Sequence, residues 1–298
     1  GPNRERDRRC APRSPRLDHG GVPVRSHLAR LPGVDVCALC RVHHVRELDG
    51  RAACFRPLPE RASDDLFDGI VIKLGKNFSN TSLLPSGIIV AGSACSDKKL
   101  SEFALENKIG GLEFLSCIPG TVGGGLRMNA GAMGWEIYDL VEWVSFLLPD
   151  GSIHEIPGNQ LNIGYRYCRE AKDGIALHAK LKAEGKSDHK AIRSAIEELA
   201  QKRRATQPRE ASAGCIFKNP DKQSAGWLIE NCGMKGERIG SAVVSDVHAN
   251  FIVNEGGATA EDVISLMQKV RKRVNQETQV TLEPEVGLLG KKWEDQLS

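Results

Sequence analysis

The stretch GLEFLSCIPGTVGGGLRMNAGAMG, from Gly111 to Gly134, is the most informative part of the sequence. Between Pro119 and Gly131 it holds five glycines and one proline. Glycine allows unusual backbone dihedral angles and lets the backbone come very close to a ligand. Consecutive amides of this kind can cradle a pyrophosphate, although a tight structural turn would also explain them. Because the dinucleotide fingerprint G-x-G-x-x-G is missing, spacing alone leaves both interpretations open.

A second stretch, SAGCIFKNP, contains Cys215 shortly before Lys218 and Asn219. A thiol with an ordinary pKa of about 8.5 is mostly protonated at neutral pH, so it can serve as a proton donor. A single cysteine is also a common small buried residue, and the residues alone favour that alternative.

Charged side chains mark two further places. Glu283 and Glu285 in TLEPEVGLLG are two residues apart, so on a strand they would share one face, but Pro284 stands between them. Arg166 lies in GYRYC. Taken singly, each of these charges is most simply explained as solvent-exposed.

Periodicity after residue 63 predicts mixed strands and helices, an α+β or α/β pattern. The expected elements are strands at 69–74 and 87–93, a helix at 97–107, a hairpin at 140–156 that turns at 149–151, and helices beginning at 187–188 and 259. Thr259 followed by Asp262 is close to a capping box. The apolar stripe of this last helix is expected in the core, and it consists of Val263, Leu266, Met267, Val270 and Val274.

Composition is that of an ordinary soluble protein, with 40% hydrophobic and 27% charged residues. A net charge of +3 is too small to imply a nucleic-acid or membrane partner. No apolar run reaches the roughly 18 residues that span a bilayer, and no secretory signal is visible. Nine irregularly spaced cysteines suit reduced thiols. We therefore expect a cytoplasmic protein.

The first 62 residues differ from the rest. They hold thirteen Arg and no Lys, with four of the nine Cys and four of the eight His, and show no sustained period of 2 or 3.6. The sequence CALCRVHH offers possible zinc ligands at Cys37, Cys40, His43 and His44. Structural zinc sites usually separate their ligand pairs by a dozen or more residues, so a metal is not expected.

Five motifs in order resemble the UDP-N-acetylenolpyruvoylglucosamine reductase family over about residues 63–298. They are GLEFLSCIPGTVGGGLRMNAGAMG, GYR, AGCIFKNP, AGWLIENCGMKGERIGSAVVSDVHANFIVN and LEPEV. The short path from Arg166 to Arg204 is similar to the loop-less type (type II). The resemblance implies an α+β fold: an FAD-binding domain of the vanillyl-alcohol-oxidase/PCMH type at 63–185 and an α+β substrate-binding domain at 186–298.

The resemblance also implies chemistry. NADPH reduces FAD, and the reduced flavin passes hydride to UDP-N-acetylglucosamine enolpyruvate to give UDP-N-acetylmuramate for peptidoglycan. Arg166 and Glu285 match the groups that stabilise the developing negative charge. Cys215 matches the proton donor, which is usually serine; a thiol is more acidic than an alcohol, keeps this chemistry possible and adds sensitivity to oxidation. The implied substrate-binding residues are Tyr165, Asn219 and His248. The implied FAD-binding residues are Ile118, Pro119, Gly120, Thr121, Gly123, Gly124, Asn129 and Gly131.

The chain departs from the family before the strand at 69–74. The family has a GxGSN loop there that cups the other side of the FAD pyrophosphate, and this sequence has PERASDDLFDG. Cys117 and Gly125 replace residues that are commonly glycine and alanine. Our hypothesis is that residues 1 to about 62 are an out-of-frame reading of the missing half-domain, with the frame restored near Asp64. A monomer is expected.

Two alternatives remain, and only the second belongs to a different class of protein. One is another FAD-dependent oxidase of the same fold, against which FKNP and LEPEV argue. The other is a non-catalytic zinc- or nucleic-acid-binding protein built around the arginine-rich segment.

Overall fold

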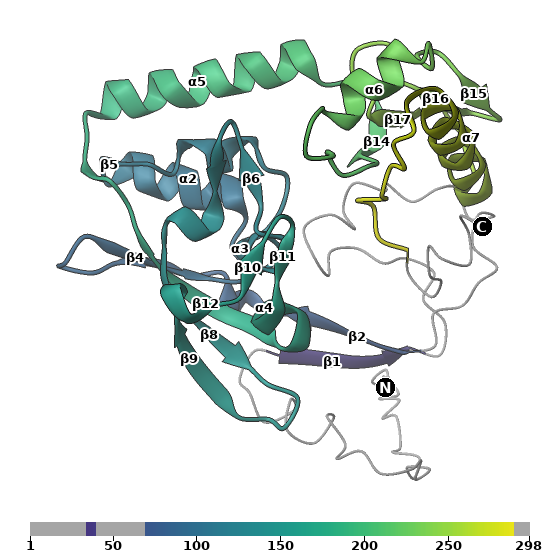
Figure 1. The fold of residues 1–298 in the computed structure, drawn as a ribbon. Helices are drawn as coiled ribbons and strands as arrows, with labels where there is room; N and C mark the ends of the chain where they lie inside the picture. Colours follow the sequence, from purple (N-terminus) through teal and green to yellow (C-terminus); the bar gives the residue numbers. More distant parts are fainter. Residues whose placement is uncertain (1–33, 40–68, 289–298) are drawn as a thin grey trace, which may run out of the picture.

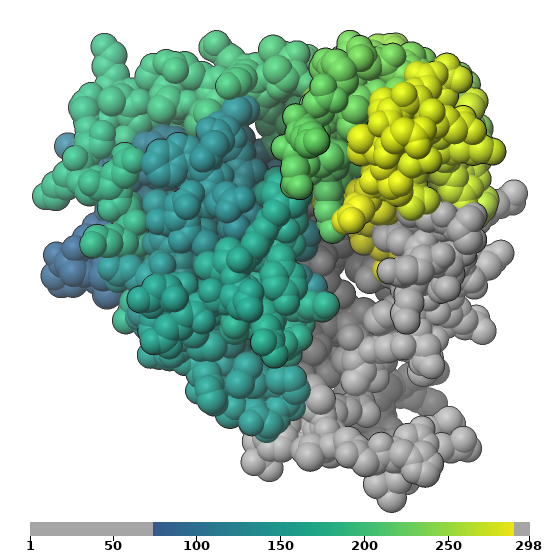
Figure 2. All heavy atoms as spheres, in the orientation of Figure 1, coloured from purple at the N-terminus to yellow at the C-terminus, as the bar shows by residue number. Residues whose placement is uncertain are grey.

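The computed structural model describes residues 34–39 and 69–288. Their buried side chains form two large hydrophobic clusters with no member in common. The first cluster runs from Ile89 to Leu181, and the second runs from Ile216 to Leu282. In Figure 2 the green and yellow C-terminal residues lie beside the blue and teal earlier residues. The chain thus builds two cores, as an α+β protein with two domains would.

The first core is built on a five-stranded antiparallel sheet. Its strands, in spatial order, are β3 (Thr81–Leu83), β4 (Ile88–Gly92), β12 (Ile175–Lys182), β8 (Val141–Leu147) and β9 (Ile153–Pro157). Ala179 in the central strand pairs with Ala91 on one side and Val144 on the other. All three are completely buried, which places one face of the sheet in the core.

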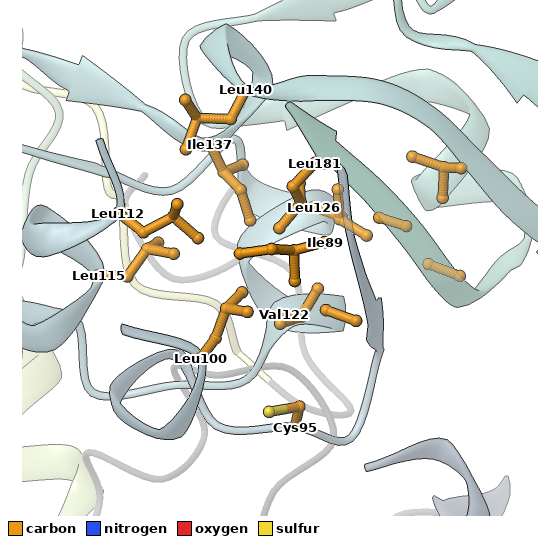
Figure 3. Packing of buried hydrophobic residues seen from close by; sticks show 14 of the residues in the cluster. Ile89, Cys95, Leu100, Leu112, Leu115, Val122, Leu126, Ile137, Leu140 and Leu181 are labelled. Carbon is orange, nitrogen blue, oxygen red and sulfur yellow. The ribbon is translucent and has the colours of Figure 1, made fainter. Parts of the chain in front are cut away.

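Two helices cover that face. They are α2 (Asp97–Glu106) and α3 (Val122–Met128). Figure 3 shows Leu100 of α2 and Leu126 of α3 directed toward Ile89 of the sheet. α2 begins at the N-cap Ser96, whose hydroxyl accepts a hydrogen bond from Lys99 N–H at 3.2 Å. The sheet therefore fixes the position of α3, which belongs to the glycine-rich segment.

Short elements complete the first half. Paired strands are β5 (Ile109–Gly110) with β13 (Gly185–Lys186), β6 (Gly131–Ala132) with β7 (Trp135–Glu136), and β10 (Ile163–Gly164) with β11 (Tyr167–Cys168). The single-turn helices are η2 (Lys76–Phe78), η3 (Glu113–Cys117), η4 (Ile137–Asp139), η5 (Gly158–Gln160) and α4 (Arg169–Asp173).

The second core packs two helices on a four-stranded antiparallel sheet. The strand order is β14 (Ala211–Cys215), β17 (Phe251–Asn254), β16 (Ala242–Val244) and β15 (Arg238–Ile239), and the helices are α6 (Ala225–Asn231) and α7 (Ala260–Thr278). The capping box of Thr259 and Asp262 opens α7, as predicted. The predicted apolar stripe is confirmed, with Val263 partly buried and the other four residues fully buried.

The long helix α5 (His189–Thr206) joins the halves and begins at the N-cap Asp188. Figure 1 shows it passing over the first half and ending near α6. It contacts α2 and η3, and Leu199 packs against the first core. The boundary at 185/186 stays a prediction, although these contacts associate α5 with the first half.

The predicted strands at 69–74 and 87–93, the helix at 97–107 and the hairpin at 140–156 are confirmed within one or two residues. Gly151 takes φ +85° in the hairpin turn. One strand was not predicted: β1 (Val34–Leu39) lies inside the segment in which we found no sustained periodicity. It pairs antiparallel with β2 (Gly69–Leu74), in the register Val34 to Leu74, because strand pairing needs only matching backbone groups. The remainder of residues 1–62 lies outside the described residues.

Candidate active site

The glycine-rich segment folds into η3, a turn at Pro119–Gly120 and α3. The Thr121 hydroxyl accepts a hydrogen bond from Gly124 N–H at 3.3 Å and so caps α3. Gly123 lies so close to β4 that an added Cβ would be 2.9 Å from the Cβ of Ser93. Glycine is therefore needed here for packing between a helix and a strand end as well as for any ligand.

The amides of this segment have different partners. Val122 N–H donates to Cys95 O and Gly123 N–H donates to Ser93 O, both at 2.9 Å. Within the described part of the chain, the N–H groups of Gly120 and Thr121 donate no hydrogen bond. The row of predicted phosphate-binding amides is thus partly used inside the fold, and two amides at the start of α3 remain available to a ligand.

Buried polar atoms near α3 also fit a polar cofactor. Ser93 and Asn129 are 2% and 1% exposed, and Ser93 Oγ and Asn129 Oδ1 have no hydrogen-bond partner among the described residues. Buried polar atoms are normally paired, so atoms like these indicate a missing partner. Together with the amides of Gly120 and Thr121, they fit a large polar group lying along α3.

Arg166 occupies the turn of the β10–β11 hairpin. Its φ of +55° is uncommon for a residue other than glycine, so surrounding contacts must hold it. Its Nε donates to Glu285 Oε1 at 3.1 Å, and its Nη1 donates to the backbone oxygen of Asn129 at 3.3 Å. The guanidinium is therefore fixed from both halves of the molecule.

Glu285 reaches Arg166 because residues 283–285 pair with residues 216–218. Lys218 N–H donates to Glu283 O and Glu285 N–H donates to Ile216 O, both at 2.8 Å. The two carboxylates of this segment have different surroundings. The side chain of Glu283 is 72% exposed and forms an ion pair with Lys218, whereas that of Glu285 is 4% exposed.

Tyr165 contacts this ion pair, and Cys215 directly precedes Ile216, whose backbone oxygen accepts from Glu285 N–H. The Tyr165 hydroxyl donates to Glu285 Oε2 at 3.4 Å. Burial, and after it the negative charge of Glu285, raises the pKa of Tyr165, and Cys215 adds a smaller effect in the same direction. Cys215 ends β14, opposite Phe251, and is half-buried. The three residues predicted to be catalytic therefore lie around one place.

Asn219 and His248 lie on the same side of the second core. Asn219 Oδ1 accepts a hydrogen bond from Ala225 N–H at 3.0 Å, at the start of α6. His248 Nδ1 accepts from Asn250 N–H at 3.2 Å, and burial lowers the pKa of His248. A neutral imidazole that accepts at Nδ1 carries its proton on Nε2, so it presents one neutral donor.

Two residues of this region escaped the sequence reasoning. Asn250 is 1% exposed and pairs with both backbone groups of Phe217, at 3.0 and 2.8 Å, which fixes the segment that follows Cys215. Glu136 accepts a hydrogen bond from Asn129 Nδ2 at 2.6 Å. The signal for Asn250 was its place two residues after His248 in the motif at 225–254, whereas no pattern in the sequence marks Glu136.

The described residues show neither a metal-binding cluster nor a membrane-spanning helix. Within 34–39 and 69–288, no group of three or more His, Cys, Asp and Glu could hold a metal ion. No helix in the same ranges is long and apolar enough to cross a membrane. The possible zinc ligands Cys37, Cys40, His43 and His44 have side chains that lie outside the described part of the structure.

Comparison with known proteins gives two family matches. Residues 60–157 match an FAD binding domain, and residues 207–289 match the C-terminal domain of UDP-N-acetylenolpyruvoylglucosamine reductase. The chain is 43% identical over 231 residues to the UDP-N-acetylenolpyruvoylglucosamine reductase of Pelagibacter ubique, covering 76% of each chain. It is 41% identical over 229 residues to UDP-N-acetylenolpyruvoylglucosamine reductase 2 of Symbiobacterium thermophilum, covering 76% of this chain and 74% of the relative.

A solved structure agrees with these matches. The crystal structure of UDP-N-acetylenolpyruvylglucosamine reductase from Thermus caldophilus superposes with a TM-score of 0.64 at 36% identity. The superposition covers 72% of this chain and 76% of that one. Sequence, domain order and fold lead to one conclusion: the chain belongs to the UDP-N-acetylenolpyruvoylglucosamine reductase family.

Proposed function

We propose that the chain reduces UDP-N-acetylglucosamine enolpyruvate to UDP-N-acetylmuramate, with NADPH as the reductant and FAD as the bound cofactor. The contact of Arg166 with Glu285 beside Cys215 is the observation that supports this reaction best. The product is a precursor of peptidoglycan, so the enzyme serves cell-wall synthesis.

The proposed FAD site follows α3. Gly120 and Thr121 offer N–H groups at its start, Ser93 offers a hydroxyl, and Asn129 offers Oδ1 at its end. The full proposed set is Ile118, Pro119, Gly120, Thr121, Gly123, Gly124, Asn129 and Gly131. When bound, FAD supplies the capacity to accept a hydride from NADPH and to deliver one to the terminal carbon of the enol ether.

Arg166 and Glu285 act on the charge that this addition creates. Hydride arrival places negative charge on the substrate carboxylate and on the carbon beside it. A guanidinium held by two fixed acceptors can stabilise that charge without reorganising. We assign this role to Arg166, which Glu285 orients through Nε. The resemblance implies that Glu285 contributes as an acid group, because a carboxylic acid O–H, unlike a carboxylate, can donate a hydrogen bond to the developing charge.

Cys215 completes the reduction by giving its thiol proton to the carbon next to the carboxylate. The thiol takes a proton back from solvent, so that one hydride and one proton are added overall. Tyr165, Asn219 and His248 are the proposed substrate-binding residues. The neutral Nε2–H of His248 and the amide of Asn219 suit a diphosphate.

The partners and the domain boundaries are also proposals. With a net charge of only +3, we propose a cytoplasmic monomer that needs no membrane or nucleic acid. We propose an FAD-binding domain at 63–185 and a substrate-binding domain at 186–298. Residues 1–62 are proposed to be an out-of-frame segment; residues 1–59 fall outside both family matches, which supports this proposal.

Reading the underlying DNA in the two other frames tests that last proposal. A GxGSN-like loop in one of them, upstream of Asp64, is the expected result. If neither frame encodes such a loop, the proposal fails. Under this proposal, a protein made with the restored frame retains more FAD than the present chain does.

The activity is tested by anaerobic spectroscopy on the purified, FAD-loaded protein. NADPH should bleach the absorbance of the oxidised flavin, because hydride transfer reduces it. Adding the enolpyruvyl nucleotide should restore it. Recovery with O₂ but not with the nucleotide would instead identify an oxidase of the same fold.

A further inference from the structure

A chain of hydrogen bonds links Arg166 to a carboxylate that the reaction does not use. Asn129 Nδ2 donates to Glu136 Oε2 at 2.6 Å, a short contact for a nitrogen donor. Glu136 ends β7, and its own N–H donates to Asp139 Oδ2 at 2.8 Å, which fixes its backbone. The backbone of Glu136 is thus held in place, and its carboxylate accepts from Asn129.

Asn129 lies at the centre of this chain. It caps the C-terminal end of α3 with φ +40° and is 1% exposed. Its Nδ2 donates to Glu136 and also to the backbone oxygen of Gly164 at 3.3 Å. Both amide hydrogens thus have acceptors, so Oδ1 must point the opposite way, where it has no partner among the described residues.

The backbone oxygen of Asn129 connects this residue directly to Arg166. Its oxygen accepts from Arg166 Nη1 at 3.3 Å, and Gly164, which the Asn129 amide holds, is two residues before Arg166. Arg166 thus has one anchor from the second half, Glu285, and one from the first half, Asn129. Glu136 holds the Asn129 anchor in place by accepting a hydrogen bond from its side chain.

We infer that Glu136 is a positioning residue that orients Arg166 through Asn129; this inference rests on the proposed function. An ionised acceptor makes a stronger hydrogen bond than a neutral one. Glutamine at position 136 keeps an oxygen in reach but loses the charge, and alanine removes the acceptor. The effect should therefore be graded, smaller for Glu136→Gln than for Glu136→Ala.

Glu113 provides a matched control. Its carboxylate accepts a hydrogen bond from Gly111 N–H at 2.8 Å in the same half of the molecule. It has no bond to Asn129 or Arg166 among the described residues. Glu113→Ala therefore removes a comparable acceptor without touching the chain of bonds that ends at Arg166.

The experiment compares both half-reactions in the FAD-loaded parent, Glu136→Gln, Glu136→Ala and Glu113→Ala proteins. Stopped-flow absorbance gives the rate of flavin reduction by NADPH and the rate of reoxidation by the enolpyruvyl nucleotide. Titration of the oxidised proteins with that nucleotide gives its Kd, and the absorbance spectrum gives the FAD content. For Glu136→Ala we expect about tenfold slower reoxidation or about tenfold weaker nucleotide binding, since one hydrogen bond to a charged group is at stake.

Flavin reduction per bound FAD should stay at the level of the Glu113→Ala control, and reoxidation in Glu136→Gln should fall between the parent and Glu136→Ala. If the parent reacts with the nucleotide and Glu136→Ala matches the control, the inference about Glu136 is wrong. Equal loss in both half-reactions would also overturn it, because a general structural role would explain that. If the parent itself is not reoxidised by the nucleotide, the proposed function fails and the inference fails with it.

Discussion

Cys215 is the residue whose chemistry can be isolated most cleanly. It ends β14, close to Tyr165 and to the segment that holds Glu285, and it takes no part in the hydride transfer from NADPH to FAD under the proposed mechanism. A proton donor contributes about 10²- to 10⁴-fold to a rate. A substitution here should therefore separate the two half-reactions.

We predict that Cys215→Ala leaves flavin reduction by NADPH intact and slows reoxidation by the enolpyruvyl nucleotide at least about a hundredfold. Stopped-flow absorbance measures both rates. Cys215→Ser is the matched control, because a hydroxyl keeps a transferable proton, and it should retain activity and resist peroxide, unlike the parent. Equal loss in both half-reactions would remove Cys215 from its assigned role.

Asp97 is a fully buried carboxyl group that has no part in the proposed mechanism. It opens α2, is 0% exposed, and neither of its carboxylate oxygens has a hydrogen-bond partner among the described residues. Burial raises the pKa of Asp97 to about 7 from the ordinary value of 3.8. The folded protein therefore favours the protonated form, and ionisation of this group opposes folding.

The raised pKa of Asp97 determines how the free energy of unfolding changes with pH. The stability that protonated Asp97 contributes is fully present below about pH 4 and is lost as the pH rises to about 7. We predict that Asp97→Asn, which stays neutral, is more stable than the parent at pH 8, by up to about 4 kcal/mol. The two proteins should be similar near pH 3.5, below the ordinary pKa of 3.8. Urea unfolding at both values measures this, and a difference independent of pH would contradict it.

Among the elements, α7 shows most directly how local sequence fixes structure. Thr259 Oγ1 accepts from Asp262 N–H at 3.0 Å, and Asp262 Oδ2 accepts from Thr259 N–H at 2.8 Å. Five spaced apolar residues then bury one side of the helix in the second core. Both signals are contained within one segment, so both were predictable.

We predict that Thr259→Ala lowers the free energy of unfolding by about 1 kcal/mol, because it removes one side of the capping box. Thr259→Ser, which keeps the hydroxyl, should lose less. Urea unfolding of the FAD-free protein, followed by circular dichroism, measures both changes. Equal losses for alanine and serine would indicate that the methyl group of Thr259, and not its hydroxyl, stabilises the start of α7.

Elements that depend on distant partners were harder to predict. The glycines of the segment around α3 were recognised as a place of close approach, but the carbonyls of Ser93 and Cys95 that use two of its amides could not be. The pairing of β1 with β2 was missed, because β1 has no periodic pattern of its own. Local chemistry predicts an element, whereas pairing between distant segments leaves no trace in either one.

The same limit applies to the site. Residue types and spacing suggested a possible donor in Cys215 and possible charges in Arg166 and Glu285, yet each had a simpler explanation. Only the resemblance of five ordered motifs brought them together before the structure did. Asn250 lies inside one of those motifs but was not singled out in it, and Glu136 lies in none, so the contacts of both could be found only in three dimensions.

At the scale of the whole molecule, the bond from Arg166 to Glu285 joins side chains 119 positions apart and attached to different cores. Two glutamates in the same C-terminal segment differ sharply in this respect. Glu285 is buried against Arg166, and Glu283 makes an exposed ion pair with Lys218. The two residues therefore allow a comparison between a buried and an exposed ion pair within one segment.

We predict that Glu285→Gln slows reoxidation by the enolpyruvyl nucleotide about a hundredfold, because a fixed charge-stabilising arrangement is disturbed. Glu283→Gln should change the same rate less than about twofold, since exposed ion pairs contribute about 0–1 kcal/mol. Stopped-flow absorbance compares the two. Similar rates for both variants would show that burial of Glu285 has no bearing on the reaction.

The pairing of residues 283–285 with residues 216–218 determines when the contact between Arg166 and Glu285 can form during translation. Arg166 emerges first, Cys215 follows, and Glu285 emerges only after all of α7. The growing chain can thus complete its first core while the guanidinium still lacks its acidic partner. The buried contact between Arg166 and Glu285 can therefore form only after residues 283–285 have left the ribosome and paired with residues 216–218.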